Sequence, residues 1–171
     1  MKRVRCSVAM SLDGYIAGPK KEIDWILADP EIDFNELYAS FDTVLMGRKT
    51  YEAMRQQGSE NLMTGKEVYV FSRTLRPADC PGVTVSHDPK AVVEGLRAGE
   101  GKDMWLFGGG SLFRSLLKVD LVDSVEVALI PVLVGGGIPL LPKPASLTNL
   151  KLVRHRVYKK TGTVLLEYAV L

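Results

Sequence analysis

The stretch Met104-Trp105-Leu106-Phe107-Gly108-Gly109-Gly110-Ser111 decides the fold, because it joins a strand to a helix through three glycines. Its four apolar residues predict a short buried strand, and the apolar residues that follow it, Leu112 and Phe113 among them, have helical spacing. Successive glycine N–H groups at a helix N-terminus can bind a phosphate; the alternative is a tight turn that lets helix and sheet pack closely. The dinucleotide fingerprint G-x-G-x-x-G is not met, since Phe113 occupies its last glycine position.

Working outward from this stretch, strands alternate with helices before it, and strands follow one another without helices after it. The expected strands are Val4–Met10, Thr43–Met46, Lys66–Phe71, Val83–Ser86, Met104–Phe107, Val122–Val134, Leu150–Tyr158 and Thr163–Leu171, and the expected helices cover about 30–41, 48–57, 89–98 and 112–117. Alternation favours parallel pairing, and the final strands favour a hairpin through Tyr158–Gly162. We therefore expect an α/β fold with a mostly parallel eight-stranded sheet, an antiparallel C-terminal edge and flanking helices, formed by residues 1–171 as a single domain.

The helix at 30–41 is predicted from a start signal and an apolar face. Asp29-Pro30 has the form of an N-cap followed by proline at the first helical position. Phe34, Leu37, Tyr38 and Phe41 then recur at positions i, i+3, i+4 and i+7.

Composition excludes several classes of protein. Of the 171 residues, 46% are hydrophobic and 25% are charged, and the formal net charge is +2, as in an average globular domain. The charge is too small to indicate a nucleic-acid partner, and no apolar run approaches the roughly 20 residues of a membrane span. Cys6 and Cys80 form no disulfide framework, so reduced thiols and a cytoplasmic location are expected. His87 and His155 have no metal-ligand spacing, and no metal is expected.

Two further strand ends carry small or polar residues. Gly47-Arg48-Lys49-Thr50 lies at a strand-to-helix turn, where free N–H groups, two cations and a hydroxyl favour an anion. Ser72-Arg73-Thr74 follows the next strand, and its arginine can form two hydrogen bonds with a phosphate. The alternatives are an ordinary helix start and a polar loop. Ligands of open α/β sheets bind beyond such strand ends.

An ordered set of motifs resembles the dihydrofolate reductase superfamily. The motifs are Ala9-Met10-Ser11-Leu12-Asp13-Gly14-Tyr15-Ile16-Ala17, Leu45-Met46-Gly47-Arg48-Lys49-Thr50-Tyr51-Glu52 and Leu106-Phe107-Gly108-Gly109-Gly110. Ser11-Leu12-Asp13-Gly14 and Leu121-Val122-Asp123, followed by Ile130–Gly135, more narrowly resemble the C-terminal reductase domain of riboflavin biosynthesis. The resemblance spans essentially the whole chain.

This resemblance implies a fold with a central eight-stranded sheet and an NADPH site along the strand ends. Ala9 and Ile16 would lie at the nicotinamide, and Gly47, Arg48, Lys49 and Thr50 at the pyrophosphate and ribose phosphate. Ser72, Arg73 and Thr74 would flank the adenosine 2′-phosphate, and Phe107, Gly108, Gly109, Gly110, Ser111 and Leu112 would line the diphosphate and the nicotinamide ribose.

The substrate side departs from dihydrofolate reductase. Those enzymes place a carboxylate in the first turn of the first helix, whereas this turn offers both Glu31 and Asp33, on opposite sides of the apolar face. Both can equally be favourable charges at a helix N-terminus, and Asp13 is a third candidate that a turn explains as well. Leu27-Ala28-Asp29-Pro30 stands where dihydrofolate reductases have Leu-Pro-Trp.

The resemblance thus implies an NADPH-dependent reductase that transfers hydride to a carbonyl or imine carbon, with 5-amino-6-(5-phosphoribosylamino)uracil as one candidate substrate. A dihydrofolate reductase and a non-catalytic dinucleotide-binding module remain alternatives. Riboflavin-type enzymes usually carry a fused deaminase domain, which these residues do not include, so another pyrimidine or pterin substrate also stays open. A homodimer is expected, because the long strand over Val122–Val134 and the last strand offer apolar edge surface and because the riboflavin-type relatives are dimers.

Overall fold

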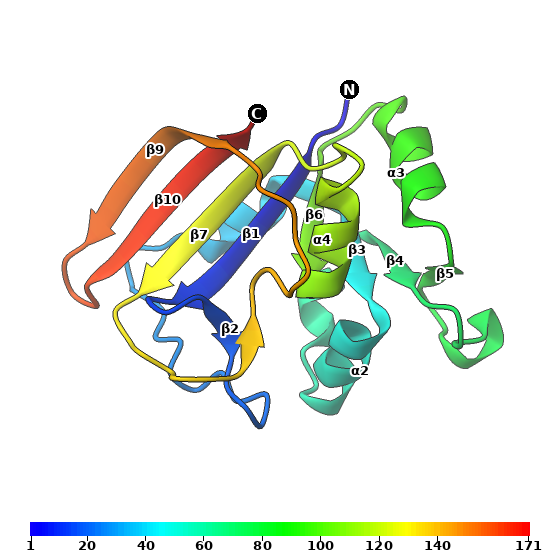
Figure 1. Cartoon of the computed structure of the whole chain (residues 1–171). Coiled ribbons are helices and arrows are strands. Elements are labelled where there is room, and N and C mark those ends of the chain that lie inside the picture. The colour runs from blue at the N-terminus through cyan, green and yellow to red at the C-terminus, as the bar shows by residue number, and fades with distance from the viewer.

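The computed structural model describes residues 1–171, apart from the side chain of Glu60. It places eight strands in one sheet and two short strands in a separate ribbon (Figure 1). The strands are β1 (Val4–Ser11), β2 (Tyr15–Ala17), β3 (Phe41–Gly47), β4 (Glu67–Phe71), β5 (Thr84–Ser86), β6 (Asp103–Gly108), β7 (Ser124–Ile130), β8 (Ile138–Pro139), β9 (Leu150–Tyr158) and β10 (Thr163–Val170). The helices are α1 (Phe34–Ala39), α2 (Arg48–Gln56), α3 (Pro89–Arg97) and α4 (Gly110–Leu117), with single 3₁₀ turns at Glu60–Met63 and Pro77–Asp79.

The order of strands across the large sheet is β5-β4-β3-β6-β1-β7-β10-β9. Neighbours from β5 to β7 run parallel, and β10 pairs antiparallel with both β7 and β9. The expected mostly parallel sheet with an antiparallel C-terminal edge is therefore confirmed, strand for strand. β2 and β8 form a separate two-stranded ribbon that sequence reasoning missed, because such short strands carry no measurable periodicity.

The expected long strand over Val122–Val134 is shorter in the structure, where β7 ends at Ile130. Pro131 has no N–H group and cannot continue the hydrogen-bonded ladder. The residues after it leave the sheet as a loop, and Val132 accepts a hydrogen bond of 2.9 Å from the backbone N–H of Leu12.

The expectation that a helix starts at Asp29-Pro30 and reaches residue 41 is wrong. The carboxylate of Asp29 accepts hydrogen bonds from the backbone N–H of Glu31 and from both the N–H and the hydroxyl of Thr161. It therefore ties this segment to the β9–β10 hairpin instead of capping a helix. Asp33 is the N-cap of α1 and accepts the N–H of Glu36 at 2.9 Å, and Phe41 already belongs to β3.

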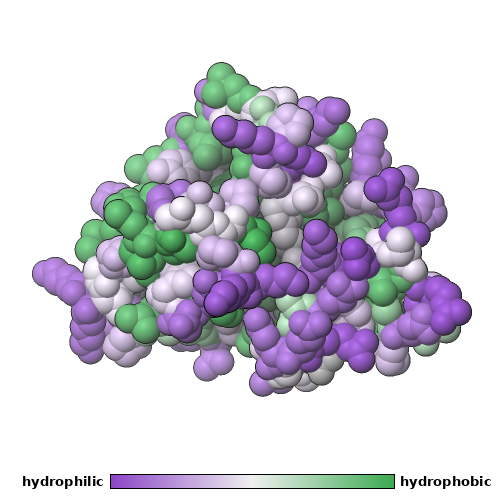
Figure 2. Space-filling view, turned by 60° about the horizontal axis from the view of Figure 1, so that its bottom comes forward, coloured by the Kyte–Doolittle hydropathy of each residue, from purple (hydrophilic) through white to green (hydrophobic). Residues whose placement is uncertain are grey.

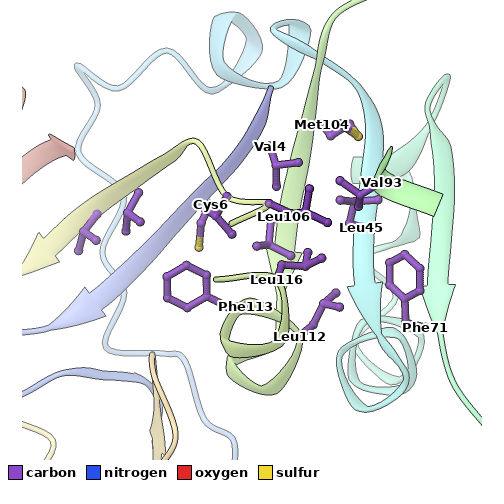
Figure 3. Close-up of a cluster of buried hydrophobic side chains, with 14 residues drawn as sticks. Val4, Cys6, Leu45, Phe71, Val93, Met104, Leu106, Leu112, Phe113 and Leu116 are labelled. Atoms are coloured by element: carbon purple, nitrogen blue, oxygen red, sulfur yellow. The ribbon is translucent and has the colours of Figure 1, made fainter. Parts of the chain in front are cut away.

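Two apolar clusters lie on opposite faces of the sheet. The first packs α3 and α4 onto β1 and its neighbours through side chains such as Cys6, Leu106 and Leu116, and Figure 3 shows the apolar side chains of α4 directed at the sheet. The second packs α2 against β3 and β4 on the other face. Alternate residues of a strand point to opposite faces, so Met104 and Leu106 enter the first cluster while Trp105 enters the second.

No helix lies in front of β7, β10 and β9 in Figure 1. The expectation that the strand over Val122–Val134 and the last strand form an edge is wrong, because β7 pairs with β1 and β10, and β10 pairs with β7 and β9. The edge strand is β9, which is exposed along almost its whole length, and several of its apolar side chains face solvent. These are Leu150, Leu152, Val153 and Val157. Among the described residues, no helix is both long enough and apolar enough to cross a membrane.

The core makes a stability prediction. Leu116 of α4 is fully buried, so Leu116→Ala should remove packing contacts, leave a cavity and lower the free energy of unfolding by about 2–5 kcal/mol. Leu147→Ala is the matched control, because Leu147 is 92% exposed and its truncation should change little. Denaturant titration of both variants measures the difference; equal losses would contradict this description of the core.

Candidate active site

The three glycine-rich or polar strand ends predicted from sequence lie at one edge of the sheet. They follow β4, β3 and β6, which are direct neighbours in the strand order, so their carboxyl ends meet. A cavity of about 1530 Å³ opens there and extends over β1, β7 and β10. Figure 2, which brings this edge forward, shows apolar surface in its left half and hydrophilic side chains along its lower and right borders.

The helices α2 and α4 both begin at this edge with a glycine N-cap. Neither Gly47 nor Gly109 is accompanied by a side-chain capping hydrogen bond, so the first N–H groups of both helices remain available to an anion. Gly108 has φ +132°, which requires glycine, and the Gly108–Gly109 peptide is cis. A Cβ on Gly110 would lie 2.6 Å from the backbone oxygen of Leu140. The glycine run is therefore needed for both conformation and packing.

The cations at this edge differ in how they are engaged. Arg48 donates to Glu52 at 2.9 Å within α2. Lys49 and Arg73 also line the cavity, and neither has an ion-pair partner in the part of the chain that the structure describes. The hydroxyl of Ser72 accepts hydrogen bonds from the backbone N–H groups of Thr74 and Leu75. These bonds fix the turn that carries Arg73. Two unpaired cations beside free helix N–H groups suit a ligand with several phosphates.

Most residues expected at a cofactor line this one cavity. They are Ala9, Ile16, Gly47, Arg48, Lys49, Thr50, Ser72, Arg73, Phe107, Gly109, Gly110, Ser111 and Leu112. Thr74 and Gly108 do not line the cavity. Thr74 belongs to the turn held by Ser72, and Gly108 to the glycine turn between β6 and α4.

The three candidate carboxylates are separated. Glu31 and Asp33 line the cavity, but Glu31 pairs with Arg156 at 3.3 Å and Asp33 is occupied as the N-cap of α1. Asp13 does not line it. The Asp13 carboxylate accepts hydrogen bonds from the Ser11 hydroxyl and from the N–H groups of Gly135 and Val134, which lower its pKa to about 2. Asp13 thereby joins the end of β1 to the loop after β7.

Sequence reasoning missed the polar floor of the cavity. Arg5 and Glu126, on the adjacent strands β1 and β7, form a two-fold ion pair, with Nε to Oε1 at 2.6 Å and Nη2 to Oε2 at 2.9 Å. This hydrogen bonding raises the pKa of the Arg5 guanidinium. Ser7 lies beside them. A signal was available in the sequence: Arg5 and Glu126 are charged residues inside otherwise apolar strands. By strand alternation they lie on the same face of the sheet as the small residues Ala9 and Ala128.

An aromatic cluster forms one wall beside this floor. Tyr38 stacks on Trp105 with ring centroids 5.3 Å apart, Phe34 lies 5.9 Å from Tyr38, and Phe107 meets Trp105 edge to face at 4.9 Å. All four line the cavity. The cavity thus offers cations and free N–H groups at the ends of β4, β3 and β6, and a polar floor with an aromatic wall near β1 and β7.

Comparison with known proteins agrees with this geometry. The uncharacterized protein YyaP of Bacillus subtilis (strain 168) is 33% identical over 98% of this chain and 94% of its own length. A crystal structure of a candidate riboflavin biosynthesis protein from Shewanella sp. PV-4 superposes with a TM-score of 0.82, at 26% identity, over 100% of this chain and 99% of that one. Dihydrofolate reductase from Enterococcus faecalis, solved in complex with NADP(H) and RAB-propyl, shares the fold with a TM-score of 0.70 at 16% identity, over 98% and 96% of the two chains.

A model of one protein family covers nearly all of the sequence. It is the RibD C-terminal domain, and it matches residues 2–164. The eight-stranded sheet, the glycine turns at neighbouring strand ends and this match agree with the resemblance seen in the sequence motifs. The chain belongs to the RibD C-terminal domain family, whose fold it shares with dihydrofolate reductase.

Proposed function

We propose that this oxidoreductase uses NADPH to reduce a carbonyl or imine carbon of a small heterocyclic substrate. The observation that carries the proposal is the meeting of two uncapped helix N-termini and two unpaired cations, Lys49 and Arg73, on one cavity. Its volume of about 1530 Å³ exceeds the roughly 300–1,000 Å³ typical for one small ligand. A dinucleotide and a second molecule can therefore share it.

The residues present fit NADPH as a group bound along neighbouring strand ends. From β4 to β1 the sheet makes three steps of about 4.8 Å each, so an extended dinucleotide can follow the edge. Arg73, Ser72 and Thr74 would hold the adenosine 2′-phosphate. Gly47, Arg48, Lys49 and Thr50 would hold the pyrophosphate and ribose phosphate, Phe107 to Leu112 the diphosphate and ribose, and Ala9 and Ile16 the nicotinamide. When bound, NADPH supplies the hydride, and the chain's residues position the reacting groups.

The substrate proton has two candidate sources on the chain, besides water. Glu31 and Asp33 both line the cavity, whereas Asp13 is committed to the backbone of the loop after β7. We favour a riboflavin-type substrate such as 5-amino-6-(5-phosphoribosylamino)uracil over dihydrofolate, because the carboxylates at α1 are engaged by Arg156 and by the helix backbone. Reduced, unpaired Cys6 and Cys80 are compatible with work in the cytoplasm. A dinucleotide-binding module without turnover is the alternative; bound NADPH that no pyrimidine or pterin oxidises in a single-turnover assay would favour it.

We also propose that two copies of the chain associate through the β9 edge. Leu150, Leu152, Val153 and Val157 are exposed along an edge strand whose outer backbone groups are unpaired. A long, apolar edge of this kind favours association with a second chain. A second copy would cover these side chains and protect the edge.

Arg73→Ala should weaken NADPH binding about ten- to a hundredfold and leave NADH binding nearly unchanged, because a charge-assisted contact to the 2′-phosphate is lost. Arg76→Ala is the matched control, since Arg76 is exposed and pairs with Asp79. Titration calorimetry with both cofactors measures the difference. Equal losses for NADPH and NADH would refute the 2′-phosphate assignment.

The purified protein should turn over dihydrofolate negligibly, because the two candidate carboxylates, Glu31 and Asp33, are engaged by Arg156 and by the backbone of α1. NADPH absorbance with dihydrofolate as substrate measures this. Rapid dihydrofolate reduction that falls about 10²–10⁴-fold in Asp33→Asn or Glu31→Gln, with unchanged NADPH affinity, would instead identify a dihydrofolate reductase.

Sedimentation at micromolar concentration should show a species of twice 18.8 kDa. Val153→Asp should shift it toward the monomer, because a carboxylate would be buried in the interface. Leu147→Asp is the control, since Leu147 is exposed outside the strand. A wild-type protein that sediments only at 18.8 kDa would exclude the dimer.

A further inference from the structure

The cavity extends well past the strand ends that suit the cofactor. Its floor there consists of Arg5 and Ser7 of β1 and Glu126 of β7. Ser7 is the direct register partner of Glu126, and Ala9 is that of Ala128, two residues further along both strands. Two residues of a strand span about 7 Å. The polar floor therefore lies one ring's length from the position proposed for the nicotinamide.

Glu126 is buried in a place where a charge needs an explanation. Only 6% of the residue is exposed, and its partner Arg5 is also largely buried. Arg5 donates in addition to Ser40 at 3.3 Å and to Asp103 at 3.4 Å, at the end of the pair away from Ser7. A buried ion pair contributes little net stability compared with an apolar pair of similar size. On the other face of the same strands, apolar side chains such as Cys6 and Val127 fill the core. Polar groups on the cavity face alone point to a ligand.

The floor retains unused hydrogen-bonding capacity. The Ser7 hydroxyl has no partner elsewhere in the described chain, although the backbone oxygen of Ser7 accepts the indole N–H of Trp105 at 3.1 Å. Oxygen Oε1 of Glu126 accepts from Arg5 and Ser124, whereas Oε2 accepts only from Arg5. Glu126 Oε2 can therefore accept one more hydrogen bond, and the hydroxyl of its register partner Ser7 can donate one.

The aromatic wall fixes the shape of what can reach these groups. Tyr38 and Trp105 are stacked beside the floor, and the indole N–H of Trp105 donates a hydrogen bond to the backbone oxygen of Ser7. Flat rings pack well against such side chains. The same ligand then presents its edge, rather than its face, to Ser7 and Glu126.

We propose that Glu126 and Ser7, with Arg5 as the residue that orients Glu126, bind the –NH–CO– edge of a planar nitrogen heterocycle. This assignment rests on the proposed reductase function and names the residues that select the substrate ring at its site. Glu126 Oε2 accepts the ring N–H, and the Ser7 hydroxyl donates to the ring carbonyl. Recognition thus comes from side chains of the sheet, and not from Glu31 or Asp33.

The test uses 6-aminouracil and its 1,3-dimethyl analogue as probes. The two share the flat ring and the carbonyls, but methyl groups replace both ring N–H hydrogens in the analogue. A buried carboxylate rejects a ligand that leaves it unpaired. Saturation-transfer NMR titrations of the protein in the presence of NADPH should give a dissociation constant for 6-aminouracil that is at least about tenfold lower than that for the analogue.

Three variants locate the preference. Glu126→Gln should reduce it, and the double variant Arg5→Met/Glu126→Leu, which replaces the ion pair by apolar side chains and avoids an unpaired buried charge, should abolish it. Glu167→Gln is the matched control: Glu167 is the register partner of Glu126 on β10 but does not line the cavity. Its preference should equal that of the wild type.

The results separate this inference from the cofactor proposal. An N–H preference that disappears only in the Glu126 variants, with an unchanged melting temperature in the double variant, supports the inference. No binding of 6-aminouracil at millimolar concentration, equal binding of both probes, or a preference that survives the double variant would overturn it. NADPH titrated alone tests the cofactor proposal independently, because none of these substitutions touches Lys49 or Arg73.

Discussion

The structure depends on the two different faces of β1, the central strand that pairs with β6 on one side and β7 on the other. Its apolar residues, Val4 and Cys6 among them, pack under α4 and hold the sheet to its helices. Its other face carries Arg5, Ser7 and Ala9, which line the cavity. A single strand thus supplies both the centre of the core and the floor of the site, so the site is built on the most rigid part of the fold.

The strand order explains why the site can hold two molecules. Because β4, β3, β6 and β1 are consecutive neighbours running in one direction, their carboxyl ends form a continuous edge with two helix N-termini. Beyond β1 the cavity continues over β7 and β10, where the chain's antiparallel ending extends the sheet and α1 contributes Phe34 and Tyr38 to the cavity wall. The edge at β4, β3 and β6 is therefore rich in cations and N–H groups, and the region over β1 and β7 is bounded by the sheet and by aromatic side chains.

The charges follow the same division. Lys49 and Arg73 are unpaired near solvent, where long-range attraction for an anion survives. Arg5 and Glu126 are paired in the interior, where a single charge would be prohibitively costly, and Arg5 also contacts Asp103, whose charge Arg3 balances. A buried, neutral pair can select ligands by hydrogen bonding without attracting a particular net charge.

The sequence by itself determined the mostly parallel sheet, the glycine turns and most of the residues that line the cavity at the ends of β4, β3 and β6, because strand periodicity and glycine-rich turns are local signals. Only the tertiary structure decided which carboxylates face the cavity. Asp29 and Asp13 were bound by backbone groups about 120–130 residues away, and Arg5 and Glu126 met across 121 residues. Contacts at such separations leave no mark on local spacing, so the start of α1 and the polar floor could be seen only once the chain was folded.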